Sequence, residues 1–198
     1  MNWMLLSGGA AATFTGSVQF LNCTAYDLLC DIALSLSNMN RAAGRFPWSV
    51  AQHSLLVARM LPPELVLEGL LHDAHEAITG DIPTPWANWL PDNVLTVVKS
   101  AKKAVQTEIE RMLGYEPAGN TDALAKADLL AFYYECNYFR AGDVDSAAKD
   151  LNLCIPQNRI PEDIEKFFIG VGSLSADKVE TMFVSAVLSA LEERRNAK

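Results

Sequence analysis

The side chains of this sequence that could do chemistry concentrate in one region. All three histidines lie between positions 53 and 75: His53, His72 and His75. Residues 70–85, LLHDAHEAITGDIPTP, contain two of these histidines together with three acids: Asp73, Glu76 and Asp81. Imidazoles and carboxylates at such close spacing are the side chains that bind metal ions and transfer protons.

Four of the polar residues predict a metal site. The apolar run LVLEGLL before His72 indicates a buried helix, and burying His72 beside Asp73 costs free energy unless both are paired or bind an ion. His53 lies on the preceding predicted helix, which a helical hairpin would bring alongside, and Asp128 interrupts the apolar face of LAKADLLAFYY. These four residues are predicted to hold one divalent ion through nitrogen and oxygen ligands. A water on such an ion becomes a nucleophile near neutral pH.

Two further acids are predicted to act beside the ion. Glu76 comes one helical turn after His72, so it is expected on the same face and within reach of a proton on that water. Asp81 lies in the proline-rich segment GDIPTP, a rigid loop that would hold its carboxylate at the mouth of the pocket. His75 is rotated by about 60° from His72 on a regular helix. It is therefore expected near the site without being a ligand.

Each feature has a structural explanation when it is taken alone. Asp128 could form a salt bridge on a helix face, Glu76 could be a solvated acid, and His75 could be a packed core histidine. The combination of a histidine on one helix, His-Asp on the next and a distant Asp favours the metal site. A zinc metalloprotease is excluded, because the order H-D-A-H-E matches neither H-E-x-x-H nor H-x-x-E-H.

The elements that must position these residues are predicted to be helical. Periodicity and start and stop signals place helices at 24–41, 49–61, 62–80, 92–113, 121–142 and 175–198. A loop is expected at 81–91, and a short helix and a loop within 143–170. Residues 3–21, rich in Gly, Ser and Thr, suit a short strand or hairpin. The fold class is therefore all-α, with six or seven helices and a small N-terminal β-hairpin.

The composition of the chain limits the classes of partner that it is expected to bind. The chain has 198 residues and a net charge of −8, which argues against binding a nucleic acid polymer. None of the four cysteines forms a C-x-x-C pair, so reduced thiols in a cytoplasmic protein are expected. The apolar start MNWMLLSGGAAATF is too short for a membrane span and lacks a cationic region, so no membrane partner is expected.

The pattern H…HD…D resembles that of the HD superfamily of metal-dependent phosphohydrolases. His53, His72-Asp73 and Asp128 carry it. The segments SVAQHSLLVA, LLHDAHEAITGDIPTP and LAKADLLAFY are similar to those of the bacterial 5′-deoxynucleotidases. They are also similar to those of the related phage enzymes that hydrolyse dATP to deoxyadenosine and triphosphate. The resemblance implies one HD-domain helical bundle over residues 1–198, with its motif core at about 24–140.

The resemblance also implies residue roles. The four residues of the pattern would hold the catalytic ion, Glu76 would serve the water or the leaving oxygen, and Asp81 would lie near the sugar and the scissile phosphate. Arg41, in NMNRAAGRF, matches the arginine that contacts the substrate phosphate, and Arg45 is a second candidate. The tryptophan that follows this arginine in the family is absent here, and Trp48 is a candidate to replace it. Members of the family are homo-oligomers, so we expect a homo-oligomer.

Two substrates are compatible with these motifs. Attack of water on the α-phosphorus would release phosphate from a deoxynucleoside monophosphate or triphosphate from a dNTP. The ion would be Co, Zn or Mn, with Mg accompanying a triphosphate. A triphosphate needs additional cations, for which the sequence offers Lys126, Arg45, Lys99, Lys102 and Lys103. The alternatives are an alarmone or other nucleotide hydrolase of the HD class, and a non-enzymatic helical module that binds a protein.

Overall fold

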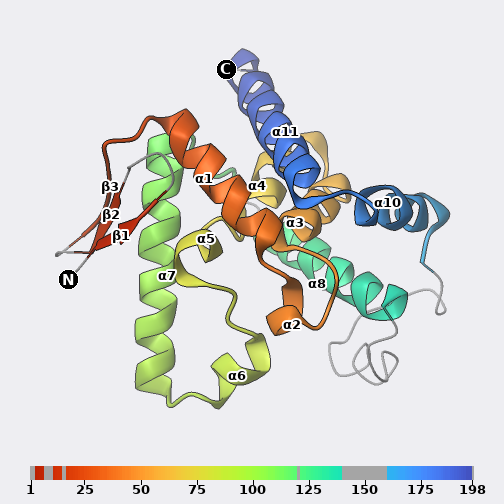
Figure 1. Ribbon diagram of the computed structural model, residues 1–198, viewed down its shortest axis with the longest axis horizontal. Helices are drawn as coiled ribbons and strands as arrows, with labels where there is room; N and C mark the ends of the chain where they lie inside the picture. The colour runs from red at the N-terminus through yellow and green to blue at the C-terminus, as the bar shows by residue number, and fades with distance from the viewer. Residues whose placement is uncertain (1–2, 7–10, 15–16, 120, 140–159, 198) are drawn as a thin grey trace.

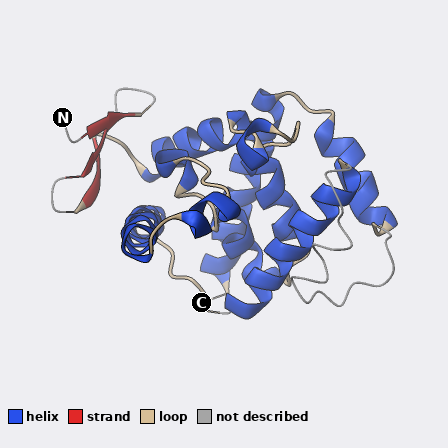
Figure 2. Cartoon of the chain, turned by 90° about the horizontal axis from the view of Figure 1, so that it is seen from below, coloured by secondary structure: helices blue, strands red, loops and turns tan. Residues whose placement is uncertain are grey.

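The computed structural model describes residues 3–6, 11–14, 17–119, 121–139 and 160–197. The described chain is mostly helical, with a small sheet at its N-terminus (Figure 1). The predicted fold class is confirmed, and the hairpin has a third strand. Strands β1 (Trp3–Leu5), β2 (Ala11–Phe14) and β3 (Val18–Leu21) form an antiparallel meander. The sheet lies to one side of the helices, with β3 against helix α7 (Asp92–Leu113) (Figure 2).

Two helices begin at the predicted residues because their sequences carry complete capping boxes. Helix α1 (Ala25–Asn38) is capped by Thr24, whose hydroxyl accepts the amide of Asp27 at 3.1 Å. Helix α3 (Val50–Arg59) is capped in the same reciprocal way by Ser49 and Gln52. Such a box satisfies amide groups that the first turn leaves without partners. It therefore fixes where α3 begins, and with it the position of His53.

The helix predicted over 62–80 is wrong as one continuous element. The chain instead forms a 3₁₀ turn η2 (Pro63–Leu65), helix α4 (Val66–Leu71), a tight turn over 72–75 and the short helix α5 (Glu76–Thr79). In the tight turn the amide of Ala74 donates to the carbonyl oxygen of Leu71 at 3.0 Å. The amide of Glu76 donates to the carbonyl oxygen of Asp73 at 2.9 Å. These are three-residue bonds, so the backbone here is wound more tightly than an α-helix.

The remaining helices follow the sequence with two further differences. The predicted loop at 81–91 contains a short helix, α6 (Thr84–Trp89), since prolines at and near its start favour a first helical turn. A short kinked segment, α2 (Arg41–Gly44), precedes α3. The other helices are α7, α8 (Thr121–Tyr138), α10 (Glu162–Gly172) and α11 (Ala176–Asn196). The part of the prediction that concerns 140–159 lies outside the described residues.

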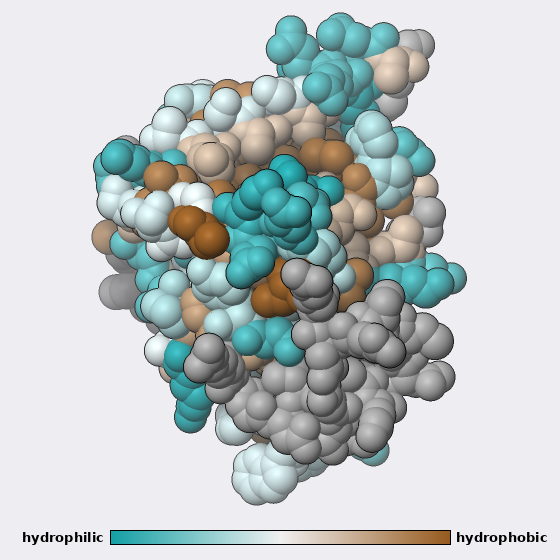
Figure 3. All heavy atoms as spheres, turned by 90° about the vertical axis from the view of Figure 1, so that its right-hand side faces the viewer, coloured by the Kyte–Doolittle hydropathy of each residue, from teal (hydrophilic) through white to brown (hydrophobic). Residues whose placement is uncertain are grey.

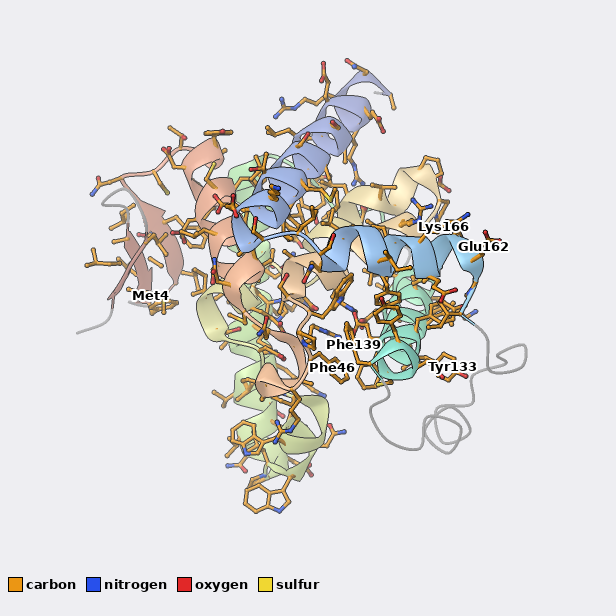
Figure 4. The ribbon with its side chains drawn as sticks, turned by 45° about the vertical axis from the view of Figure 1, so that its right-hand side comes forward. Met4, Phe46, Tyr133, Phe139, Glu162 and Lys166 are labelled. Atoms are coloured by element: carbon orange, nitrogen blue, oxygen red, sulfur yellow. The ribbon has the colours of Figure 1, made fainter. Side chains whose placement is uncertain are left out.

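Helix α3 lies between two apolar cores. One core joins α3 to α1, α4, α7 and α11, and the other joins it to α8 and α10. In the second core Phe46 and Phe139 face one another with ring centroids 5.4 Å apart, beside α8 (Figure 4). Every residue from 50 to 58 is buried, and His53 has no exposed surface. A histidine in this position is therefore isolated from solvent on both sides of its helix.

The outer surface is mixed in polarity where α10 lies. Hydrophilic side chains project from this face and hydrophobic ones show between them (Figure 3). Glu162 and Lys166 of α10 form an ion pair of 2.7 Å there, while Ile169 of the same helix is 59% exposed. Among the described helices, none combines the length and the apolar character that crossing a bilayer requires.

We predict that the close approach of α3 and α4 depends on Gly69. A Cβ at this position would lie 2.8 Å from the Cα of Ala58 and 2.6 Å from a methyl carbon of Leu61. Gly69→Ala should therefore push α4 from α3 and lower the free energy of unfolding by about 2 kcal/mol, measured by urea unfolding. Gly170→Ala is the matched control, because a Cβ there meets nothing within 4 Å. A helical alanine should make that variant slightly more stable, and equal destabilisation of the two would contradict the prediction.

Candidate metal centre

Three elements bring the four predicted ligands together. His53 comes from the first half of α3, His72 and Asp73 from the tight turn after α4, and Asp128 from α8. The Nε2 atom of His53 is 2.9 Å from Oδ1 of Asp128. The Nε2 atom of His72 is 3.8 Å from the same oxygen and 3.1 Å from Oδ2 of Asp73. One ligand atom from each of His53, His72 and Asp128 lies within 4.8 Å of the other two, so this group could hold a metal ion.

The hydrogen bond of His72 leaves one ring nitrogen directed at the cluster. Its Nδ1 is 2.9 Å from the carbonyl oxygen of Gly69, and because a carbonyl only accepts, Nδ1 carries the hydrogen. Nε2 is buried and makes no hydrogen bond, although Asp73 lies 3.1 Å away. The two atoms are close without the alignment of a donor and an acceptor. Ligands of a common ion are arranged in this way, with the other ring nitrogen held by a backbone carbonyl.

Glu135 completes the site and was not predicted from the sequence. Its Oε1 is 2.6 Å from Nδ1 of His53 and accepts the indole N–H of Trp48 at 3.1 Å, and the side chain is fully buried. A carboxylate on the far nitrogen fixes the ring of a metal-binding histidine and raises its basicity. The sequence did contain a signal, because Glu135 interrupts the apolar run AFYYEC two helical turns after Asp128. Residues seven apart lie on nearly the same face of a helix.

Arg41 reaches the site, whereas Arg45 does not. The guanidinium of Arg41 has Nη1 3.6 Å from Oδ2 of Asp73 and Nε 3.5 Å from Oε2 of Glu135, and its side chain is 14% exposed. The loop that carries it turns back through Ala42, at a left-handed φ of 53° that alanine adopts only with strain. Arg45 is exposed and donates to a carbonyl of its own loop. Only the first of the two predicted phosphate-binding arginines is therefore in place.

Trp48 cannot replace the missing tryptophan as an accessible ring. It is fully buried, packs on Phe168 with centroids 5.0 Å apart, and donates its N–H to Glu135. This corrects the sequence-based suggestion that its ring contacts the substrate. The residue instead anchors the carboxylate that orients His53.

Glu76 lies in a second group of polar atoms beside the first. Its side chain is buried, with Oε1 3.6 Å from Nζ of Lys102 and Oε2 without a hydrogen-bond partner. Burial and the charges of Asp73 and Asp81 raise the pKa of Glu76 to about 8. Asp81 is therefore close enough to act on Glu76 electrostatically, and its place at the mouth of the pocket stays a prediction. Of the five cations suggested for a triphosphate, Lys102 is partly buried against this group, whereas the others have exposed positions: Arg45, Lys99, Lys103 and Lys126.

Gln106 of α7 holds the tight turn in place and was also missed. Its Oε1 accepts the amide of His75 at 3.2 Å, and its Nε2 donates to the carbonyl of Leu71 at 3.0 Å. Nε2 also donates to Glu110, one turn along α7, at 3.0 Å. The amide therefore bridges both ends of the turn that carries His72 and Asp73. A single amide on a polar helix face gives no sequence signal for such a contact.

The charges of the cluster are mutually dependent. Burial lowers the pKa of both His53 and His72, but the carboxylates around them outweigh it and the net shift of each pKa is upward. Burial conversely raises the pKa of Asp73 and Asp128, and the neighbouring histidines lower both pKa values below their ordinary range. With neutral imidazoles, the carboxylates here outnumber the single guanidinium. A divalent cation fits this donor set, since it supplies the positive charge that protons on the rings would otherwise provide.

Comparison with known proteins gives one relative and no family. The chain is 39% identical over 102 residues to the uncharacterized protein YfdR of Escherichia coli strain K12, a match that covers 50% of this chain and 54% of YfdR. The chain therefore spans about half the length of the curated relative that it matches. No family model matches the chain.

We predict that Glu135 controls metal affinity through His53. Glu135→Gln keeps an oxygen that can accept from the imidazole but removes the buried negative charge, so the affinity for Mn²⁺ or Co²⁺ should fall by about 10- to 100-fold. Isothermal titration of the purified variant measures this. Glu165→Gln, an exposed acid on α10, makes the same chemical change away from the site and should bind as wild type does. Equal affinities in the two variants would contradict the assigned role.

The buried carboxyl of Glu76 predicts a pH-dependent stability. Its pKa is about 8 in the folded protein against an ordinary value of 4.5, so between these pH values the folded state binds more protons than the unfolded chain. The free energy of unfolding contributed by this group is therefore lost as the pH rises through that range. In chelator-treated protein, Glu76→Gln should gain about 1–3 kcal/mol over wild type between about pH 5 and pH 8.5, measured by urea unfolding. A constant difference across this range would show that the group does not titrate there.

Proposed function

We propose that this chain is a metal-dependent phosphohydrolase of the HD class that hydrolyses 2′-deoxynucleotides at the α-phosphorus. One divalent ion would be held by His53, His72, Asp73 and Asp128, and the product would be a deoxynucleoside with phosphate or triphosphate. The observation that carries the proposal is the convergence of this donor set with a buried arginine. Arg41 lies 3.6 Å from Asp73, and a guanidinium beside a metal site is the pairing that a phosphoryl group needs.

The ion, when bound, supplies a Lewis acid and lowers the pKa of a water molecule. The protein supplies the rest of the chemistry through groups already held in position. Arg41 is fixed between Asp73 and Glu135, so its planar fork can neutralise charge on phosphoryl oxygens without first being ordered. His53 is held by Glu135 at 2.6 Å, so it presents Nε2 toward the centre.

Proton transfer is assigned to Glu76 and Asp81. Glu76 has a pKa of about 8 in the metal-free protein, close to the pH at which a general acid or base is most effective. Asp81 influences Glu76 electrostatically from the segment that follows α5. One of these carboxyl groups would accept the proton of the attacking water, and the other would serve the 5′ oxygen that leaves.

The number of phosphates on the substrate depends on cations outside the metal site. Lys102 is the cation of α7 that lies against Glu76, at 3.6 Å from its Oε1. It supplies one positive charge beside the centre, which supports binding of a phosphate tail beyond the α-phosphate. Both deoxynucleoside monophosphates and dNTPs remain substrates to be tested.

The proposal predicts hydrolysis with a defined product. Purified chain loaded with Mn²⁺, Co²⁺, Zn²⁺ or Mg²⁺ should convert a dNMP to deoxynucleoside and phosphate, or a dNTP to deoxynucleoside and intact triphosphate, in a panel that includes rNTPs. His53→Ala removes a ligand, so the variant should lose its bound metal. Removing only the hydrogen-bond partner of a ligand lowers activity by up to roughly 100-fold, so removing the ligand itself should reduce turnover by more than that. Chromatography of the products and metal analysis of the dialysed protein provide both readouts.

Two controls make this test decisive. Glu165→Gln changes an exposed acid of α10 and should retain both metal and turnover. Circular dichroism of His53→Ala establishes that the variant is folded. A folded wild-type chain that binds no ion and hydrolyses none of the nucleotides would overturn the proposal and favour a non-enzymatic helical module.

A further inference from the structure

A second group of potential metal ligands lies beside the first. One ligand atom from each of Asp73, His75 and Glu76 lies within 4.8 Å of the other two. Only Asp73 of this group is used by the ion of the proposed function. We propose that Asp73, His75 and Glu76 hold a second divalent cation, with the carboxylate of Asp73 shared between the two ions.

The buried atoms of this group lack partners within the described chain. Nε2 of His75 and Oε2 of Glu76 are both inaccessible to solvent and make no hydrogen bond. The side chain of Glu76 is 7% exposed, so water cannot readily solvate its second oxygen. An unsatisfied buried carboxylate oxygen is costly. Two such atoms, on residues whose ligand atoms lie within 4.8 Å of one another, are explained if a cation binds there.

One ring nitrogen of His75 is available to an ion. Its Nε2 is buried and has no hydrogen-bond partner, while the backbone amide of the same residue donates to Oε1 of Gln106 at 3.2 Å. A neutral imidazole that carries its hydrogen on Nδ1 presents Nε2 as a lone pair to an ion.

The tight turn creates this group. In 3₁₀ geometry, residues three apart are eclipsed, whereas in an α-helix they are offset by about 60°. The three-residue bond from Glu76 to Asp73, at 2.9 Å, therefore turns the two carboxylates to the same side, and His75 lies between them in the chain. A continuous α-helix would have aligned Glu76 with His72 instead. The departure from regular helix thus separates the polar residues into two adjacent sets.

Two described cations border this group, and neither pairs with Oε2 of Glu76. Nζ of Lys102 is 3.6 Å from Oε1 of Glu76, and Nη1 of Arg41 is 3.6 Å from Oδ2 of Asp73, whereas Oε2 of Glu76 has no hydrogen-bond partner. Asp73 and Asp81 both act on Glu76 as further negative charges. One imidazole with two carboxylates is a donor set suited to Mn²⁺, Co²⁺, Zn²⁺ or Fe²⁺ rather than to Mg²⁺, which prefers oxygen alone.

The experiment measures stoichiometry and coupling in the full chain, with Mn²⁺ as the probe. Titration of chelator-treated wild type should give two Mn²⁺ per chain. Two ions that share one carboxylate lie about 3.5–4 Å apart, so the Mn²⁺ resonance should show exchange coupling between the ions. His75→Gln should bind one Mn²⁺ and give the spectrum of an isolated ion. Lys102→Met, which removes a competing ammonium, should bind the second Mn²⁺ about 10-fold more tightly.

The outcomes separate this inference from the proposed function, with which it shares Asp73 and Glu76; if the second ion is bound by Glu76, proton transfer falls to Asp81. If the wild-type chain binds a single uncoupled Mn²⁺, the second site is overturned, whether or not the chain hydrolyses deoxynucleotides. The proposed function is decided separately, by hydrolysis. Unchanged stoichiometry in His75→Gln also overturns it. If His75→Gln is not folded by circular dichroism, Lys102→Met carries the test, and an unchanged affinity for the second ion in that variant counts against the site.

Discussion

The structure depends on a concentration of negative charge placed where water is largely excluded. Asp73, Asp128 and Glu135 converge with two buried imidazoles between α3, α8 and the turn after α4. Among the described residues, Arg41 is the permanent cation that pairs with these carboxylates. Buried charge of this kind is tolerated when each group has a partner of opposite sign or an ion. The surrounding contacts follow from this constraint: Trp48 and His53 both donate to Glu135, and the Arg41 loop adopts a strained backbone to insert its guanidinium.

The second constraint is the tight turn over 72–75. Gln106 bridges its two ends, and Gly69 allows α4 to approach the backbone of α3. Because the turn is wound with three-residue bonds, Glu76 faces Asp73 and leaves the face of His72. The turn that carries His72 and Asp73 is therefore held by packing and by amide contacts, in addition to the contacts that the predicted ligands make with one another. Such positioning lets a site keep its geometry whether its charge is balanced by protons or by cations.

Helix α3 links the metal centre to the rest of the fold. It is covered on one side by α1, α4 and α11 and on the other by α8 and α10. His53 is therefore fully buried. The partly exposed side of the centre is formed by Asp128, whose side chain is 44% exposed, and by the partly buried Lys102.

The sequence by itself determined the fold class, most of the helices and the four residues that meet. Periodicity and the capping boxes at Thr24 and Ser49 are local properties of the chain, so they were sufficient for the helix starts. The four ligands were found by residue type, because a buried histidine or carboxylate needs a partner or an ion. The tertiary structure decided what no local pattern encodes. Glu135, Gln106 and Lys102 acquire their roles only through contacts with residues at least 26 positions away, and Trp48 loses its suggested role by burial. The break in the helix over 62–80 is accompanied by the contacts of Gln106 with both ends of the turn, which join residues 31 and 35 positions apart and which no local pattern encodes.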